Sequence, residues 1–481
     1  MALRFAPKME RKIILGLMLI ILAGTVLRMY DSTTESLWTD EAFVLHHAEQ
    51  QTIDGVVQAV VEREAAPPFY YVLMHFWIAL VGTSEFSLRM PSVLFGIASI
   101  VMLFLVARRL FDDKTALLAA AFMSISAMHV VYAQEARLYL MFTFLVICST
   151  YAFLRINEKK WMAVYFFVMT IAIYTNYIAL LVLGIHGVWL IVEKKFNKRW
   201  LLVSCSVLVA ALPLLPIVIA QFFGRNNGLA ETLVSRGVPQ VLANFGIFFF
   251  ALPPILALGG IFMIARKVKI SDSLFGIMIA VFSLSYVYLA LRPLTVFGIT
   301  LTQPLITSYF LVRHSLFLAP IIHVYFAHRI MQMDTRKLQA LCIGLLILSN
   351  MITLSFYYSK PTKTQWREAV EFIERNMNRQ DVQTVLLDTG GESNQKLLAY
   401  YTSKPYRAVP LTEHTRKKFV QMDAVELQRT IEHEEEFFLI LANNPLTKDQ
   451  YKDMLDARYV RVDSVELNEI RVFYYRQPVR D

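Results

Sequence analysis

Long, uninterrupted apolar runs are the feature that most constrains how this chain can fold. Hydrophobic residues make up 56% of the 481 residues and charged residues only 18%, which excludes a disordered, collagen-like or ordinary water-soluble chain. A transmembrane barrel would show short alternating segments instead, so we predict an all-α polytopic membrane protein. Eleven predicted spans lie near residues 12–30, 88–107, 115–133, 138–154, 161–176, 177–192, 200–222, 241–265, 273–291, 309–328 and 338–357.

The basic residues predict how the spans are oriented. With a cytoplasmic N-terminus, every loop that falls on the cytoplasmic side is basic, as the positive-inside rule requires. These loops contain Arg108, Lys160, Lys194, Lys267 and Lys337. The net charge of +9 is therefore attributed to the cytoplasmic loops, and no nucleic-acid partner is predicted. We expect a multi-pass plasma-membrane protein whose first span is retained as an anchor.

One apolar stretch, residues 67–82, is too short for a regular span and begins with two prolines. Counting it as a span would place the later basic loops outside. We therefore predict an interfacial or re-entrant helix within a long first outside loop, about residues 31–87, which also holds amphipathic helices. An even number of spans is the alternative.

The composition changes after residue 357, where charged residues become frequent and helical and strand patterns alternate. This order predicts a small α/β domain, extracytoplasmic if the chain has eleven spans. The predicted domains are a transmembrane catalytic domain, 1–357, and an α/β domain, 358–481. The expected elements are helices at 368–377 and 395–401, strands at 382–387 and 437–442, and a hairpin at 459–465 and 470–475.

A pair of carboxylates follows the first predicted span, in the sequence Trp38-Thr39-Asp40-Glu41. Thr39 is able to cap the following helix. Neighbouring helical residues point about 100° apart, so we expect one carboxylate to face the site and the other to support it. The alternative is that both acids only complement the positive N-terminus of a helix.

Arginines at the outer ends of later spans are the second group of candidates, because charges at membrane depth cost roughly 2.5 to 3.5 kcal/mol each. The planar fork of Arg137 could bind a phosphate, and Arg313, deeper in its span, is also a functional candidate. For Arg137 the alternative is a snorkelling side chain paired with Glu135. The Pro67-Pro68 pair also has a plain interpretation, as the start of an aromatic interfacial helix.

No phosphate-binding glycine loop or metal-binding His-Glu-x-x-His motif occurs in the sequence. The three cysteines lie inside apolar runs without metal-ligand spacing. No cofactor is therefore firmly predicted, and a divalent metal is left open.

Several motifs occur in an order that resembles GT-C superfamily membrane glycosyltransferases, family 39-like, the relatives of protein O-mannosyltransferases and lipid A aminoarabinose transferases. The resemblance covers most of residues 1–375. Ala66 and Asn176 stand where relatives often have histidine, and an Arg-His pair stands where they have Arg-Tyr. The motifs are LWTDEAF, APPFYYVLMHFW, SEFSLRMPS, YAQEARLYLMF, YTNYIALLVL and RHSLFLAP.

The resemblance implies an enzyme that moves a sugar from a polyprenyl phosphate to a lipid, glycan or protein acceptor on the extracytoplasmic side of the membrane. It implies that Asp40 is catalytic. We expect Asp40 to act as a base in an inverting displacement with Glu41 beside it, and Arg137 and Arg313 to hold the phosphate. The supporting residues are Glu135, Tyr139, Pro67, Pro68, Tyr70 and His314.

Two other classes of function remain open at this stage. A transporter or flippase for lipid-linked sugars would use the outer carboxylates and arginines for translocation. Such proteins generally carry paired halves and polar breaks near mid-bilayer, whereas here no repeat is visible and the charges gather at one face. A noncatalytic scaffold that presents the C-terminal domain is the third class.

Overall fold

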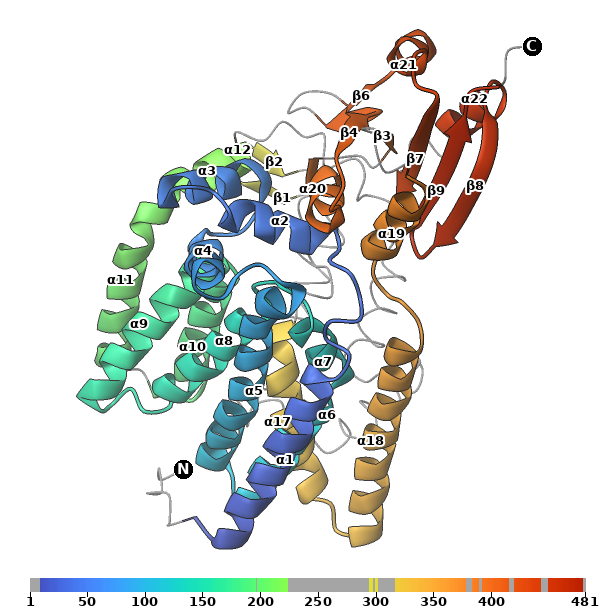
Figure 1. Cartoon of the computed structure of the whole chain (residues 1–481). Helices are drawn as coiled ribbons and strands as arrows, with labels where there is room; N and C mark the ends of the chain where they lie inside the picture. The colour runs from blue at the N-terminus through green and yellow to red at the C-terminus, as the bar shows by residue number, and fades with distance from the viewer. Residues whose placement is uncertain are drawn as a thin grey trace. The chain divides into compact units, whose positions relative to one another are not determined.

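The computed structural model describes residues 9–195, 197–223, 294–296, 299–301, 316–377, 383–388, 392–414, 419–442 and 449–478 (Figure 1). The spans predicted at 241–265 and 273–291, and the start of that at 309–328, lie outside the described residues. The chain divides into two compact units. Unit 1 comprises residues 1–32, 51–82 and 86–357, and unit 2 comprises 33–50, 83–85 and 358–481.

Unit 1 is helical in the described residues, apart from the two-stranded ribbon of β1 (Leu294–Val296) and β2 (Ile299–Leu301). Helix α6 packs against α1 and α17, while α9 packs against α8 and α11. The helices are α1 (Arg11–Met29), α3 (Ile53–Arg63), α4 (Phe69–Val81), α5 (Glu85–Leu110), α6 (Asp113–Ile125), α7 (Ala127–Ala133), α8 (Tyr139–Phe153), α9 (Lys159–Thr175), α10 (Ala179–Val192), α11 (Lys198–Ala211), η1 (Leu212–Leu214), α12 (Leu215–Phe223), α17 (Ala319–Met331) and α18 (Arg336–Ser359).

Four helices among the described residues are long and apolar enough to cross a membrane: α1, α5, the run Lys198–Gln221 and α18. The number becomes five if the bent pair α6 and α7 is one span. Exposed apolar side chains cover α1 and α18, as expected for helices that face lipid. The predicted class, a mostly helical multi-span membrane protein, is confirmed by this architecture and by the comparison of folds given below.

The short apolar stretch is a helix, as predicted. Helix α4 begins directly after Pro68, where the missing proline N–H costs no intrahelical hydrogen bond. It ends at Gly82, whose φ of 84° is left-handed and favours glycine. With 13 residues, α4 is shorter than a bilayer-spanning helix.

The span predicted at 115–133 is not one straight helix. The helix breaks at Ser126, and the two parts, α6 and α7, are bent by 55°. The break frees backbone groups, and two other helices satisfy them. The Arg28 guanidinium donates to the carbonyls of Met123 (3.0 Å) and Ser124 (2.9 Å), and Asn350 Oδ1 accepts from the Ala127 amide (3.0 Å). A fully buried arginine therefore takes the place of the missing helical hydrogen bonds.

We expect Arg28→Met to destabilise unit 1, since the side chain also donates to the Gly24 carbonyl (2.8 Å) and contacts His129 Nδ1 at 2.9 Å. Leaving buried acceptors unsatisfied costs about 1–3 kcal/mol each. The thermal unfolding midpoint in detergent should therefore fall clearly. Arg11→Met, at the exposed start of the same helix, is the matched control and should change little. Equal midpoints for both variants would contradict this structural role.

Unit 2 contains a five-stranded mixed sheet with strand order β4-β3-β7-β9-β8. Strand β3 runs parallel to β4 and β7, whereas β9 pairs antiparallel with β7 and β8. The elements are α2 (Thr39–Ala48), α19 (Trp366–Asn376), β3 (Gln383–Asp388), α20 (Glu392–Tyr401), β4 (Tyr406–Pro410), β5 (Thr412–His414), β6 (Phe419–Gln421), α21 (Ala424–Ile431), β7 (Glu436–Ala442), α22 (Gln450–Asp456), β8 (Val460–Leu467) and β9 (Ile470–Arg476).

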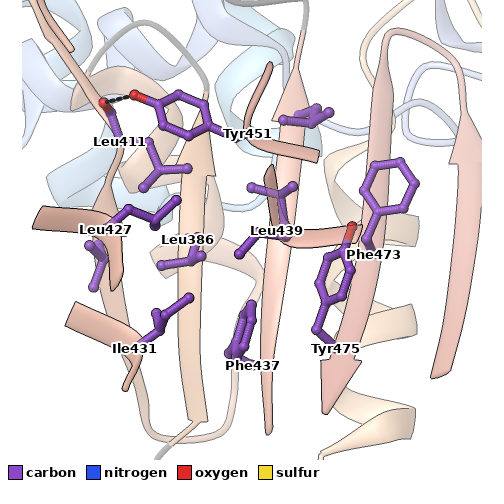
Figure 2. Packing of buried hydrophobic residues seen from close by; sticks show 12 residues of the cluster. Leu386, Leu411, Leu427, Ile431, Phe437, Leu439, Tyr451, Phe473 and Tyr475 are labelled. Atoms are coloured by element: carbon purple, nitrogen blue, oxygen red, sulfur yellow. Dashed lines mark hydrogen bonds between the residues drawn. The ribbon is translucent and has the colours of Figure 1, made fainter. Parts of the chain in front are cut away.

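The sheet is stabilised by a buried apolar cluster on one face, shown in Figure 2. Leu386, Leu439 and Phe473 come from strands, and Leu427 comes from α21. The Tyr451 hydroxyl donates to the Leu411 carbonyl at 2.9 Å, so its polar end is satisfied inside the cluster. Strand β3 is buried throughout, as a central parallel strand should be, while the edge strand β8 is largely exposed.

The α/β character of the C-terminal part is confirmed, and every helix and strand predicted there is present. Helices α19 and α20, strands β3 and β7 and the β8–β9 hairpin match the predicted segments. The sequence did not predict β4, β5, β6, α21 or α22, which are short.

Candidate active site

Helix α2 in unit 2 carries the predicted carboxylate pair. The residue at its N-cap position is Trp38, in extended conformation, and Thr39 is the first helical residue. The idea that Thr39 caps the helix is therefore wrong; its hydroxyl donates instead to Asn394 Oδ1 at 3.0 Å. This contact joins the start of α2 to α20.

The two carboxylates of α2 have different surroundings. Asp40 is half-buried, whereas Glu41 is fully buried and lies 3.5 Å from the ammonium of Lys363. The difference follows from the 100° step between neighbouring helical residues. Both acids also lie in the first turn, where they complement the helix dipole, so their catalytic roles stay predictions.

The loop before α2 is fixed by hydrogen bonds within unit 2. The Tyr401 hydroxyl accepts from the Leu37 amide at 2.6 Å and donates to Glu85. Burial, reinforced by Glu85, holds the pKa of Tyr401 well above its usual range, so the phenol stays neutral and keeps its proton as a donor. Arg367 also binds Glu85 and donates to the Thr34 carbonyl.

A second group of predicted residues lies in unit 1, around Arg137. Its guanidinium makes a buried salt bridge with Glu64 (3.2 Å) and lies 5.7 Å from the centre of the Tyr139 ring. Glu64 directly follows α3 and was not predicted. Tyr71 lies within electrostatic range of both charges. The result is a cation on an aromatic face with one carboxylate beside it, an arrangement that can also receive a phosphate oxygen.

The turn that contains Arg137 is tied to the end of α1. The Gln134 side-chain amide donates to the Tyr30 carbonyl at 2.6 Å, and its oxygen accepts from the Tyr357 hydroxyl at 2.9 Å. Glu135 is buried in the same turn. The Gln-Glu-Ala-Arg motif is therefore held between two helices that are distant in sequence.

The proline motif is held from α12. The Gln221 side chain donates to the Ala66 carbonyl at 3.0 Å and accepts from the Tyr177 hydroxyl at 2.8 Å. Pro67 and Pro68 are buried, and the Tyr70 ring meets the Tyr71 ring edge-on, with centroids 5.6 Å apart.

Some predicted residues cannot be placed, because Arg313 and His314 lie outside the described residues. Asp40 and Glu41 belong to unit 2, and Arg137, Glu135, Tyr139, Pro67, Pro68 and Tyr70 belong to unit 1. Across the described ranges, no three His, Cys, Asp or Glu side chains gather into a metal site.

A comparison with solved structures finds proteins of similar fold. The crystal structure of ArnT from Cupriavidus metallidurans in the apo state matches over 95% of this chain and 97% of its own, at 14% identity and a TM-score of 0.50. Its complex with undecaprenyl phosphate gives 15% identity and a TM-score of 0.47 over the same shares. Archaeal oligosaccharyltransferase AglB from Archaeoglobus fulgidus, in complex with an inhibitory peptide and a dolichol-phosphate, matches over 78% of this chain and 62% of its own. The sequence identity is 13% and the TM-score is 0.45. The first of these matches, with its TM-score of 0.50, shows that the chain has an ArnT-like fold.

A comparison of sequences finds a family model that matches part of the chain. Residues 65–220 match the family model described as dolichyl-phosphate-mannose-protein mannosyltransferase. A comparison with curated proteins found none that matches. The resemblance seen in the motifs is confirmed over this part of the chain.

Proposed function

We propose that this protein transfers a sugar, with inversion, from a polyprenyl-phosphate donor to a lipid, glycan or protein acceptor on the extracytoplasmic face of the membrane. One observation from α2 carries the proposal. Glu41 is buried beside Lys363, so its charge is matched, while Asp40 next to it remains half-buried. This difference in burial supports Asp40 as the working base and Glu41 as its supporting residue.

The chemistry needs a base and a stabilised leaving group. The acceptor hydroxyl oxygen forms a bond to C1 of the sugar, its proton passes to Asp40, and the bond from C1 to the phosphate oxygen breaks with its electron pair on the phosphate. Phosphate is a good leaving group, so a cation replaces a general acid there. Arg137 in unit 1 is our candidate cation, with Arg313 as a second. Unlike a typical glycoside hydrolase, the reaction uses one working carboxylate.

The topology that we propose has eleven spans and a cytoplasmic N-terminus. The basic loops support it, since Arg155 and Lys160 lie together at the junction of α8 and α9, and Lys194 and Lys195 lie between α10 and α11. Unit 2 would then be extracytoplasmic, where lipid-linked sugars are used. The lipid tail of the donor would lie between spans.

The decisive test is transfer by the purified protein in liposomes. We expect labelled sugar to move from one member of a panel of polyprenyl phosphate sugars to a membrane extract, with release of polyprenyl phosphate in equal amount. Movement of intact donor between leaflets, without release of polyprenyl phosphate, would instead support a flippase. The absence of both sugar transfer and donor movement would support a scaffold.

A further inference from the structure

A short segment at the start of the C-terminal part, residues 362–367, holds the loop that leads into α2. The Thr362 hydroxyl binds the Glu35 carboxylate (2.9 Å), and the Ser36 hydroxyl donates to the Thr364 carbonyl (3.0 Å). Arg367 donates to the Thr33 carbonyl at 3.1 Å. All of these contacts lie within unit 2. The start of α2 therefore depends on a segment more than 300 residues away.

Lys363 is the residue of this segment whose side chain reaches the carboxylate pair. Its side chain is 6% exposed, and its ammonium lies 3.5 Å from Oε2 of Glu41, which is 0% exposed. The Lys363 carbonyl accepts from Asn468 Nδ2 (2.9 Å), and the neighbouring Thr364 hydroxyl donates to Glu469 Oε2 (2.9 Å). The β8–β9 turn thus fixes the backbone from which the ammonium extends, so the lysine approaches Glu41 from a defined direction.

We propose that Lys363 is a positioning residue of the transfer reaction, which acts through Glu41 to orient Asp40. The inference rests on the proposed function. A buried carboxylate without a cation turns toward water or takes up a proton. Either change moves the first turn of α2, which Asp40 shares with Glu41. A displacement of about 1 Å can lower the rate 10²-fold, so Lys363 can affect kcat without touching the substrate.

The test compares kcat and KM for the donor in three folded variants. Lys363→Met should lower kcat by about 10- to 100-fold and leave KM within about twofold, because the lysine orients the base and does not hold the donor. Lys363→Arg keeps the charge and should restore most of kcat. Lys360→Met removes an exposed lysine three residues before Lys363 and should behave as wild type.

Coupling to Glu41 separates this role from simple stabilisation. If Lys363 acts through Glu41, the double variant Lys363→Met/Glu41→Gln should have a higher kcat than Lys363→Met alone, since the carboxylate charge that Lys363 balances is removed with it. Wild-type kcat in folded Lys363→Met, a raised KM with unchanged kcat, or additive losses would overturn the positioning role alone. Absence of transfer by wild type would overturn the proposed function as well. Should Lys363→Met not fold, the double variant is compared with Glu41→Gln instead. Equal kcat values support action through Glu41, and a further loss of kcat in the double variant overturns it.

Discussion

Asp40→Asn is expected to lower sugar transfer by about 10²- to 10⁴-fold while the protein remains folded. Asparagine has nearly the same shape as aspartate but cannot accept the proton of the acceptor hydroxyl. A general base contributes about 10²- to 10⁴-fold, so kcat should fall by that factor, with a smaller change in KM for the donor. The measurement is initial-rate transfer in liposomes, normalised to the monodisperse protein recovered by size exclusion.

The matched control for this variant is Asp54→Asn. Asp54 is the acid in the first turn of α3, as Asp40 is in the first turn of α2, and it is exposed. If Asp40 only complements a helix dipole, both variants lose roughly 0.3–1 kcal/mol of stability and both keep their activity. Equal transfer by Asp40→Asn and wild type would remove Asp40 from the mechanism.

The local features of the fold were predictable because they depend on neighbouring residues. The apolar runs at 12–30 and 338–357 correspond to α1 and α18, and the Pro-Pro pair marks the start of α4. The break at Ser126 was not predictable, since the sequence there contains neither proline nor glycine. It depends on Arg28 and Asn350, which come from two distant helices and satisfy the freed backbone groups.

Within the candidate site, the residue types were predictable but their partners were not. The Asp40-Glu41 pair is visible as a motif, yet Lys363 lies 322 positions from Glu41. Glu64 lies 73 positions from Arg137, on the other side of the proline motif. Single-sequence patterns report helix faces and caps, which span a few residues. They carry no signal for an ion pair that forms only when distant segments pack together.

Arg137→Met is expected to have the second largest effect, and the salt bridge with Glu64 makes this variant ambiguous by itself. Breaking a largely buried ion pair by removing one partner costs up to about 3–5 kcal/mol. Loss of a cation that stabilises the departing phosphate costs about 10²- to 10³-fold in kcat. We expect both a lower unfolding midpoint and a lower kcat. Arg155→Met is the matched control, because Arg155 also pairs with a glutamate and lies over an aromatic ring, but the pair is partly exposed.

The double variant Glu64→Gln/Arg137→Met separates the two contributions. It removes both charges of the ion pair, so the unfolding midpoint should return toward that of wild type. Transfer should stay low, because the cation for the phosphate is still missing. A double variant that regains both stability and transfer would show that Arg137 matters only for the packing of α3 and the Gln-Glu-Ala-Arg turn. The donor phosphate would then need another cation, and Arg313 would be the next residue to substitute.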